Sequence, residues 1–527
     1  MKNEILTPNK RQLDWYGRKT AFIHFTVNTF TGNEWGDGTE SPEIFNPAEL
    51  DCEQWIKVLR DTGFTNAILT AKHHDGFCLW PSKYTEHSVK NSPYKNGKGD
   101  IVKEFVDACH KYGIKPGLYL SPWDRNFKDW GTEKYNDYYA NQLTELMTNY
   151  GPIYECWWDG AGSTEACYDW KRWVDIVRTN QEHCVIFGSL GATEFVDVRW
   201  VGNELGKAAD NCYATIDASS LETETGPELF SGKKDGERFI PAECDMSIRP
   251  GWFYHPEQDV LVKTPVELTK YWFTSVGRNC GILLNIPPDK RGLFCDKDIE
   301  SLKLWNDRIN DIFKENLIKD IDLTKLDNNF VIDYQFDTPQ KINCVRIEED
   351  IAFGQRINNF TVEFLIDDEW KELLNGKVIG NCFARYFDTV SAKAIRISGK
   401  AECTPVLKFV GAFYADESYF VESFENNEIF DLTKLPSAKI IHNKTEVEIE
   451  FGGIFPFNTV IIEGEKLPYF EVFAFNGSQY ESVYFGVDSS EHEVCQFKLI
   501  EGSYKIKIVS YDCDGFNDNP KISVFKR

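Results

Sequence analysis

The sequence lacks any long apolar run. No stretch approaches the roughly 18 uncharged apolar residues that a membrane-spanning helix needs, so we expect no transmembrane helix and no membrane partner. The first residues, Met1 to Glu4, turn polar at once and have none of the apolar core of a signal peptide. These absences predict a cytoplasmic protein, unless a secretion signal has been removed.

Paired cysteine motifs are also missing, and positive charge is scarce. The 15 cysteines are odd in number and contain no CxxC pair. A disulfide framework normally has an even number of cysteines in a small secreted domain, so we expect buried free thiols. Aspartate and glutamate (83) outnumber lysine and arginine (58), which gives a formal net charge of −25. Such a surface repels phosphates, and this excludes nucleic acid as a partner.

Apolar and aromatic residues are plentiful enough for several cores. The chain has 527 residues, more than the roughly 100–200 that one domain usually contains. From about residue 15 to about 317, short apolar runs alternate with helical patterns, which is typical of a parallel α/β domain. The eight predicted strands are residues 21–27, 67–73, 116–121, 153–159, 184–189, 198–203, 239–245 and 281–287.

Several helices between these strands have recognisable ends. Asp100 is placed to cap a helix that Gly113 ends, another helix is predicted within 46–63, and a last one begins near Asp298. Eight βα units predict a (β/α)8 TIM-like barrel, with its active site at the C-terminal ends of the strands. A doubly wound open sheet is the alternative, but no glycine-rich dinucleotide or phosphate loop follows the first strand.

The pattern changes after about residue 325. Short apolar segments separated by turn residues follow, with no good helix among them, and they predict a β-sandwich. A second all-β segment begins near residue 417. We therefore expect three domains: the barrel over 1–322, a β-sandwich over 323–416 and a second all-β domain over 417–527.

A candidate catalytic carboxylate ends the fourth predicted strand. Side chains alternate along a strand, so Trp157 and Asp159 face the same way. An aromatic ring beside a carboxylate suits a sugar, whose carbons stack on the ring while its hydroxyls make polar contacts. The alternative is that Asp159 only caps the helix that follows.

Two glutamates compete to be its partner. Glu204 closes the sixth predicted strand and Glu243 lies in the seventh. Glycoside hydrolysis with retention needs two carboxyl groups about 5–5.5 Å apart, one a nucleophile and the other an acid that becomes a base. The acid must hold its proton near neutral pH, which apolar surroundings favour. Both glutamates have tryptophans nearby in the sequence, so the residues alone leave the choice open.

Three histidines stand where the first two predicted strands end: His24, His73 and His74. Adjacent side chains on a strand diverge, and no HExxH motif or spaced cysteine cluster completes a metal site, so we expect no metal. Recognition of substrate hydroxyls is the favoured role. A buried structural role is the alternative for any one of them.

The barrel segment, from about Trp15 to Gly292, resembles the α-L-fucosidases of glycoside hydrolase family 29. The motifs that carry the resemblance are Phe22-Ile23-His24-Phe25 leading to Asn28-Thr29-Phe30, Lys72-His73-His74-Asp75-Gly76-Phe77 with Trp80 and Pro81, Trp157-Trp158-Asp159-Gly160-Ala161, Trp200-Val201-Gly202-Asn203-Glu204, Arg249-Pro250-Gly251-Trp252-Phe253 and Leu283-Leu284-Asn285-Ile286-Pro287-Pro288.

The resemblance implies a barrel enzyme without a cofactor that acts on fucosylated oligosaccharides or glycoproteins through a covalent fucosyl-enzyme. It places the nucleophile at Asp159. The motifs that contain Glu204 and Arg249 are similar to the branch that favours α-1,3- and α-1,4-linked fucose on Lewis-type glycans. Glu204 lies 45 residues after Asp159, the spacing of the acid/base in that branch, and Glu243 is the alternative. The residues implied to line the fucose pocket are His24, Trp35, His73, His74, Tyr119, Trp157, Arg249 and Trp252.

Residues 327–416 resemble a discoidin-type β-sandwich, a kind of module that often binds sugars. A module that only packs against the barrel is the alternative. The rival functions are a non-catalytic glycan-binding protein on a barrel scaffold, an α-L-fucosidase with α-1,2 or broad linkage preference, and a barrel glycosidase that acts on an α-galactoside or a β-glycoside.

Overall fold

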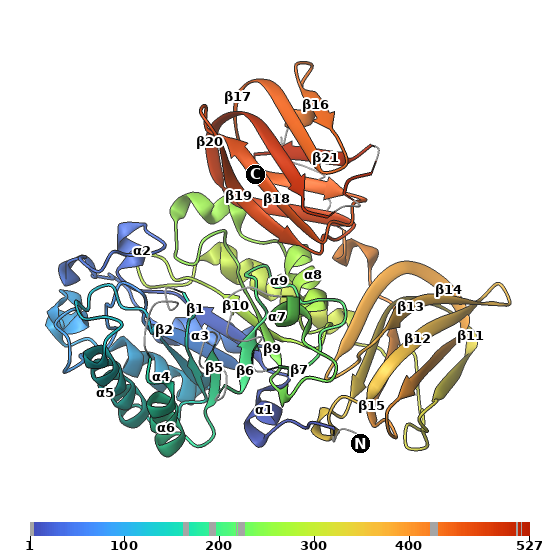
Figure 1. Ribbon diagram of the computed structural model, residues 1–527, viewed down its shortest axis with the longest axis horizontal. Coiled ribbons are helices and arrows are strands. Elements are labelled where there is room, and N and C mark those ends of the chain that lie inside the picture. The colour runs from blue at the N-terminus through green and yellow to red at the C-terminus, as the bar shows by residue number, and fades with distance from the viewer. Residues whose placement is uncertain are drawn as a thin grey trace. The chain divides into compact units, whose positions relative to one another are not determined.

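The computed structural model describes residues 5–161, 168–188, 196–217, 219, 227–421, 431–512, 515–517 and 519–526. These residues form two compact units. The first contains nearly all residues up to 421, and the second contains the residues after it together with 249–251 and 256–262. A closed parallel barrel and a five-stranded antiparallel sheet lie in the first unit, and a six-stranded antiparallel sheet lies in the second (Figure 1).

The barrel closes in the strand order β1-β10-β9-β6-β5-β4-β3-β2, all parallel. Its strands are β1 (Lys19–Ile23), β2 (Asn66–Lys72), β3 (Lys115–Leu120), β4 (Glu155–Trp157), β5 (Val185–Gly188), β6 (Val198–Trp200), β9 (Ala242–Ser247) and β10 (Gly281–Asn285). The predicted TIM-like barrel is confirmed, and each of its strands overlaps a predicted segment, although the strand ends differ from the predicted ones. The last residue of the fifth predicted segment, 189, lies outside the described residues.

Two of these differences matter for the candidate site and the topology. Strand β4 ends at Trp157, so Asp159 lies two residues beyond the strand. The predicted strand over 239–245 is divided, because Phe239 belongs to β8 (Arg238–Phe239), which pairs with β7 (Thr215–Ile216) in a separate two-stranded sheet. Pro241 lies between β8 and β9, and a proline cannot donate a ladder hydrogen bond.

Helices cover the outside of the barrel (Figure 1). The helices in the described residues are α1 (Lys10–Trp15), α2 (Asn28–Thr31), α3 (Cys52–Asp61), α4 (Ile101–Tyr112), α5 (Glu133–Asn149), α6 (Trp170–Asn180), α7 (Pro227–Ser231), α8 (Pro265–Thr274) and α9 (Asp296–Ile312). Short 3-10 helices occur along the chain at Pro42–Ile44, Val89–Asn91, Tyr94–Gly97, Pro256–Leu261, Ile351–Phe353, Glu417–Tyr419 and Leu432–Lys434. Helix α4 has the predicted ends: the Asp100 side chain accepts the Lys103 N–H, and Gly113 has a φ of 77°. Helix α3 begins later than predicted, because Asp51 caps it.

Two antiparallel sheets follow the barrel, as predicted. The first has the order β13-β12-β14-β11-β15, built from β11 (Val331–Glu349), β12 (Ile357–Ile366), β13 (Glu369–Gly376), β14 (Phe383–Ala401) and β15 (Leu407–Phe413). The second has the order β16-β17-β20-β18-β19 with β21 beside β17, built from β16 (Lys439–His442), β17 (Glu446–Glu463), β18 (Tyr469–Phe475), β19 (Tyr480–Val487), β20 (His492–Ser510) and β21 (Lys521–Phe525). Each sheet has its own buried apolar cluster.

The described cysteines agree with the expectation of buried free thiols. All thirteen cysteines among the described residues are free thiols, and all but Cys403 are buried. In the part of the chain that the structure describes, no helix is long and apolar enough to cross a bilayer.

A buried carboxylate joins four parts of the barrel wall. Asp197, which precedes β6, is 2% exposed and accepts hydrogen bonds from Asn9 and Arg11, next to and in α1. Its other oxygen accepts hydrogen bonds from Arg178 of α6 at 2.6 Å and from the main-chain N–H of Ile186 in β5 at 3.0 Å. Four donors compensate for the loss of water around this charge.

We expect Asp197→Ala to lower the free energy of unfolding by about 3 kcal/mol, because it leaves two arginines and a buried strand N–H without their acceptor. Chemical denaturation followed by tryptophan fluorescence measures the change. Asp129→Ala is the control: Asp129 pairs with Lys134 on the surface and its side chain is half exposed, so its loss should cost no more than about 0.5 kcal/mol. Equal stabilities of the two variants would contradict this role for Asp197.

Candidate active site

The C-terminal ends of the barrel strands bring most of the predicted site residues together. His24 follows β1, His73 and His74 follow β2, Tyr119 lies in β3 and Trp157 ends β4. Their rings form a continuous wall: the centroids of His24 and His73 are 5.5 Å apart, those of His73 and Tyr119 are 5.8 Å apart, and those of Tyr119 and Trp157 are 5.5 Å apart.

Two further predicted aromatics complete this wall. The Trp252 ring lies 5.0 Å from His24, and the Trp35 ring lies 5.6 Å from His74. Trp35 is 55% exposed, so it stands at the rim of the site. Arg249 follows β9 and belongs to the second compact unit, where its buried guanidinium pairs with Asp259 at 2.8 Å.

Asp159 is held by hydrogen bonds on both of its carboxylate oxygens. The Tyr119 hydroxyl donates to Oδ2 at 3.0 Å, and the Ala161 N–H donates to Oδ1 at 2.8 Å. The side chain is 27% exposed, so a substrate can reach it. Asp169 caps the following helix, α6. Asp159 is therefore not the cap of α6.

Tyr119 remains a hydrogen-bond donor to Asp159. Burial raises the pKa of the Tyr119 hydroxyl well above its usual value, and the negative charge of Asp159 raises it further. The hydroxyl therefore stays protonated near neutral pH, and its hydrogen bond orients the carboxylate.

The hydrogen bonds of His74 define its tautomer. The Ser121 hydroxyl donates to the Trp123 carbonyl at 2.7 Å, so its oxygen is left to accept from His74 Nδ1, 2.8 Å away. Burial lowers the pKa of His74 and keeps the ring neutral. Its Nε2 therefore carries a lone pair, and this atom lies 3.8 Å from Asp159 Oδ2.

His24 has the same tautomer for the same kind of reason. The Asn285 amide N–H groups donate to Ser247 and to the Trp252 carbonyl, so Asn285 Oδ1 accepts from His24 Nδ1 at 2.9 Å. Burial lowers the pKa of His24 to about 3. Two neutral imidazoles thus leave their Nε2 atoms free to accept hydrogen bonds, which suits the hydroxyl groups of a sugar.

His73 completes the trio of histidines. Its pKa is lowered well below the usual value by burial, and the neighbouring imidazoles lower it further. Its Nδ1 is buried, makes no hydrogen bond and lies 3.9 Å from Asp75 Oδ2. Among the described residues, no group of three or more histidine, cysteine, aspartate or glutamate side chains could hold a metal ion.

Glu204 reaches solvent at the mouth of the barrel. Its Oε2 accepts the indole N–H of Trp252 at 3.2 Å. Neighbouring protein atoms partly exclude water from the carboxyl, which disfavours its charged form. The negative charges of Asp159 and Glu34 disfavour the charged form further. Together they raise the pKa of Glu204 to about 7, although the indole bond acts in the opposite direction.

Glu243 lies deeper in the barrel. It is 1% exposed, and its Oε2 accepts the indole N–H of Trp157 at 3.1 Å. Burial raises its pKa well above the usual range, and the nearby charge of Glu155, a carboxyl inside the barrel, raises it further. This carboxyl supports the floor of the site and has no access to solvent.

The structure adds site residues that we did not predict from the sequence. Asp245 of β9 accepts the Trp200 indole N–H at 2.7 Å, which makes a third tryptophan–carboxyl pair beside those of Glu204 and Glu243. Strand alternation could have identified Asp245, since it faces the same way as Glu243 and lies nearer the mouth. Glu34 accepts the main-chain N–H of Trp252 at 2.8 Å, but it lies in a loop where no periodicity marks it.

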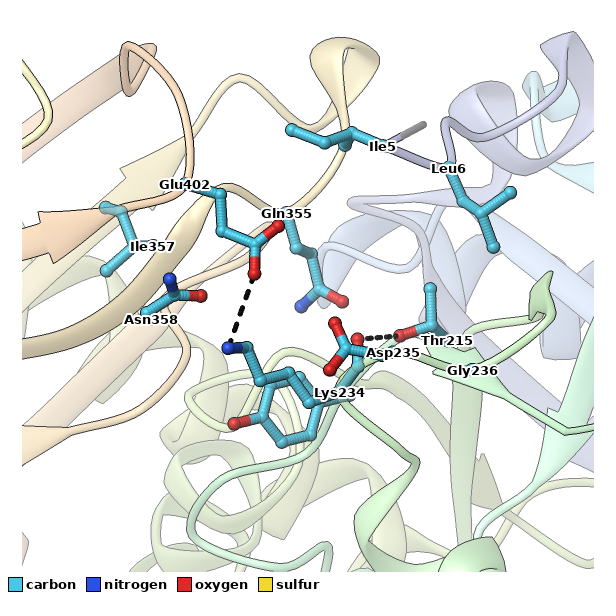
Figure 2. A pocket seen from close by; sticks show the side chains of 11 residues that line it. Ile5, Leu6, Thr215, Lys234, Asp235, Gly236, Gln355, Ile357, Asn358 and Glu402 are labelled. Carbon is cyan, nitrogen blue, oxygen red and sulfur yellow. Dashed lines mark hydrogen bonds and ion pairs between the residues drawn. The ribbon is translucent and has the colours of Figure 1, made fainter. Parts of the chain in front are cut away.

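A cavity outside the candidate active site lies in the first compact unit. Figure 2 shows Lys234 pairing with Glu402 at 3.3 Å, and Thr215 donating to the Lys234 carbonyl, along its wall. Its volume is about 570 Å³ including its opening to solvent, and none of the predicted site residues lines it.

Comparisons with known proteins agree with this geometry. The family model described as alpha-L-fucosidase matches residues 6–307, the span of the barrel. Alpha-L-fucosidase 1 of Arabidopsis thaliana is 38% identical over 446 residues, which cover 77% of this chain and 87% of that protein. The crystal structure of a glycoside hydrolase 29 family member from an unknown rumen bacterium is 31% identical, with a TM-score of 0.76, and the match covers 99% of this chain and 100% of that one.

A structure with bound sugar is also similar. A Ruminococcus gnavus GH29 fucosidase in complex with fucose is 31% identical with a TM-score of 0.73, and the match covers 79% of this chain and 96% of that one. The chain therefore belongs to the alpha-L-fucosidase family, glycoside hydrolase family 29, and is a retaining glycoside hydrolase that acts on α-L-fucosides.

Proposed function

We propose that this α-L-fucosidase removes α-1,3- or α-1,4-linked fucose from Lewis-type glycans, with Asp159 as nucleophile and Glu204 as acid and base. One observation carries the assignment of roles. Asp159 is an oriented, accessible carboxylate, whereas the pKa of Glu204 is raised to about 7 in the same pocket. Two carboxyl groups whose surroundings differ in this way fit a nucleophile and a proton donor.

In the first step the Asp159 carboxylate attacks the anomeric carbon as the bond to the leaving oxygen breaks. Glu204 gives its proton to that oxygen, which leaves as an alcohol. Esterification removes the charge of Asp159, which had helped to raise the pKa of Glu204. Glu204 is then a carboxylate that can take a proton from water, and the attack of this water on the anomeric carbon releases fucose and restores Asp159.

The pocket residues fit the fucose ring. Nε2 of His24 and of His74 would accept hydrogen bonds from two fucose hydroxyls, as their tautomers require. The aromatic rings of Trp157, Trp252 and Phe253 provide an apolar surface for the methyl group, and Phe253 lies 5.4 Å from His24. Trp35, His73, Tyr119 and Arg249 complete the proposed set.

Glu243 is the less suitable acid. A proton donor to the leaving group must exchange protons with water in every cycle, and Glu243 is buried beneath Trp157. Glu204 reaches solvent and responds to the charge of Asp159. We therefore assign Glu243 the role of fixing the Trp157 indole.

The Lewis-type preference rests on the two motifs that contain Glu204 and Arg249, and the rim of the site is compatible with it. The exposed ring of Trp35 meets Trp123 edge to face at 5.4 Å, so aromatic surface continues outward from the fucose pocket. Such a surface can stack against the sugar rings of a branched leaving group. An α-1,2 or broad linkage preference is the alternative.

We also propose the domain division 1–322, 323–416 and 417–527. The loop 277–279 joins the first antiparallel sheet to the barrel: the Ala384 N–H donates to the Gly277 carbonyl, and the Asn279 N–H donates to the Cys382 carbonyl, both at 2.9 Å. These bonds support the alternative in which the discoidin-like module packs against the barrel rather than serving mainly to bind sugar.

We expect Asp159→Ala to abolish turnover even of an activated aryl α-L-fucoside, since no covalent intermediate can form. Glu204→Ala should lose about 10²- to 10⁴-fold on natural glycans, and azide should restore its turnover of the aryl fucoside. Because azide then attacks the fucosyl-enzyme, the product is the α-fucosyl azide, which NMR distinguishes from the β-anomer.

Glu243→Ala is the matched variant for this experiment. It removes a carboxyl from the same site, but it should show no azide rescue. If azide rescues Glu243→Ala and leaves Glu204→Ala unchanged, the assignment of the acid is wrong.

The pH dependence follows from the pKa of Glu204. Glu204 must be protonated to act, so kcat/KM should fall about tenfold per pH unit above pH 7. Trp252→Phe removes an N–H that favours the charged form and should move this limb to higher pH. Glu34→Gln removes a negative charge and should move it to lower pH. Shifts in the same direction for both variants would contradict the assignment.

Product profiling on Lewis a, Lewis x and H-type oligosaccharides tests the linkage preference. We expect fucose release from both Lewis trisaccharides and little from the H-type substrate, which carries α-1,2-linked fucose. Chromatography of the released fucose measures each rate, and the aryl fucoside is the control for active enzyme. Release from the H-type substrate alone would overturn the preference and leave the fucosidase activity intact.

A further inference from the structure

The segment Trp200–Gly206, which contains Glu204, is attached to strand β9 at three points. The Val201 N–H donates to the Glu243 carbonyl at 3.1 Å, and the Gly206 N–H donates to the Asp245 carbonyl at 3.1 Å. The third point is the side chain of Trp200, whose indole N–H donates to Asp245 Oδ1 at 2.7 Å. Asp245 thus holds both ends of the segment, one end through its main chain and the other through its side chain.

The chemical character of Asp245 needs an explanation. Asp245 is 4% exposed, and the negative charges of Glu204 and Asp159 lie near it. Both burial and these like charges disfavour an ionised carboxylate at this position. An apolar side chain would fit such a position at lower cost. The described contact that needs an oxygen here is the one with the Trp200 indole.

Trp200 connects this contact to the acid. Its ring packs against the aromatic cluster that contains Trp157, and Trp252 packs against the same cluster. The Trp252 indole holds Glu204 directly, and Trp200 begins the segment on which Glu204 stands. A Trp200 ring that is free to turn would loosen both the wall and the segment.

We propose that Asp245 is a positioning residue for the acid: its hydrogen bond to Trp200 fixes the segment from which Glu204 protonates the leaving oxygen. This inference rests on the proposed role of Glu204. Asp245 is 4% exposed and its side chain holds the Trp200 indole, so its loss should affect proton donation and leave the attack by Asp159 largely intact.

The inference is tested by comparing substrates whose leaving groups need different degrees of protonation. In Asp245→Leu, we expect kcat/KM for an alkyl or oligosaccharide fucoside to fall by on the order of 10²-fold, the effect of a misplacement of about 1 Å. An aryl fucoside with an acidic phenol as leaving group needs little protonation and should lose far less. A folding defect would lower both activities by the same factor, so the ratio separates the two causes.

Asp245→Asn keeps an acceptor oxygen for the indole and should recover most of the activity that Asp245→Leu loses. Trp200→Phe keeps an aromatic ring but removes the N–H, and it should reproduce the selective loss. This variant also tests the inference if Asp245→Leu fails to fold. In the double variant Asp245→Leu/Trp200→Phe the losses should not multiply, since both changes remove the same hydrogen bond.

The matched control is a tryptophan–carboxyl pair outside the site. The Trp80 indole N–H donates to Glu145 at 2.9 Å in the same barrel, and both residues are buried. Trp80→Phe should leave the ratio between the two substrates at the wild-type value, whatever it does to the yield of folded enzyme.

Two outcomes would overturn the inference: an equal loss on both substrates in Asp245→Leu and Trp200→Phe, or an asparagine variant as impaired as the leucine variant. A failure of the proposed function itself is distinguishable. In that case Glu204→Ala would show neither azide rescue nor dependence on the leaving group, and this can be measured without any change at Asp245.

Discussion

Three hydrogen bonds from tryptophan indoles hold the acidic groups of this site. Trp157, Trp200 and Trp252 each donate an N–H, to Glu243, Asp245 and Glu204 respectively. A carboxyl group near the barrel axis loses solvation, and an indole offers it one donor on a rigid apolar ring. One donor orients a carboxyl without giving full compensation for its charge, and in all three acids the pKa remains above its usual value.

Asp159 is in different surroundings. Its donors are a hydroxyl and a main-chain N–H, both of its oxygens have partners, and the side chain meets solvent. The pocket therefore contains one carboxylate with full hydrogen bonding and one carboxyl that tends to keep its proton. In the proposed mechanism this difference is reversed, since an ester on Asp159 would take away a charge that favours the neutral form of Glu204.

Periodicity was sufficient to predict the architecture from the sequence, because alternating runs with helical spacing between them have few other folds available. It also identified Asp159, since the position follows from counting strands. Family resemblance rather than periodicity pointed to Glu204 and to the pocket residues. Together with the matches along the chain, it sets aside both the non-catalytic protein and the other glycosidases.

What the sequence could not give was depth within the barrel and direction of hydrogen bonds. Alternation puts Glu243 and Asp245 on the same face of one strand, but it does not show that Glu243 holds Trp157 and that Asp245 lies beside the segment of Glu204. The tautomers of His24 and His74 depend on Asn285 and Ser121, which come from other strands or their ends. Such information exists only once the strands have closed into a barrel.

Depth also explains why the acids of this site are not interchangeable. Glu243 lies near the buried Glu155, Asp245 lies one alternation nearer the mouth, and Glu204 lies at the mouth itself. Desolvation is the largest cause of the raised pKa in all three. The pKa of Glu204 is raised to about 7, and because Glu204 also reaches water it can both hold and release a proton. The two deeper carboxyl groups are suited to holding indoles. The shallow one, in reach of water, is suited to catalysis.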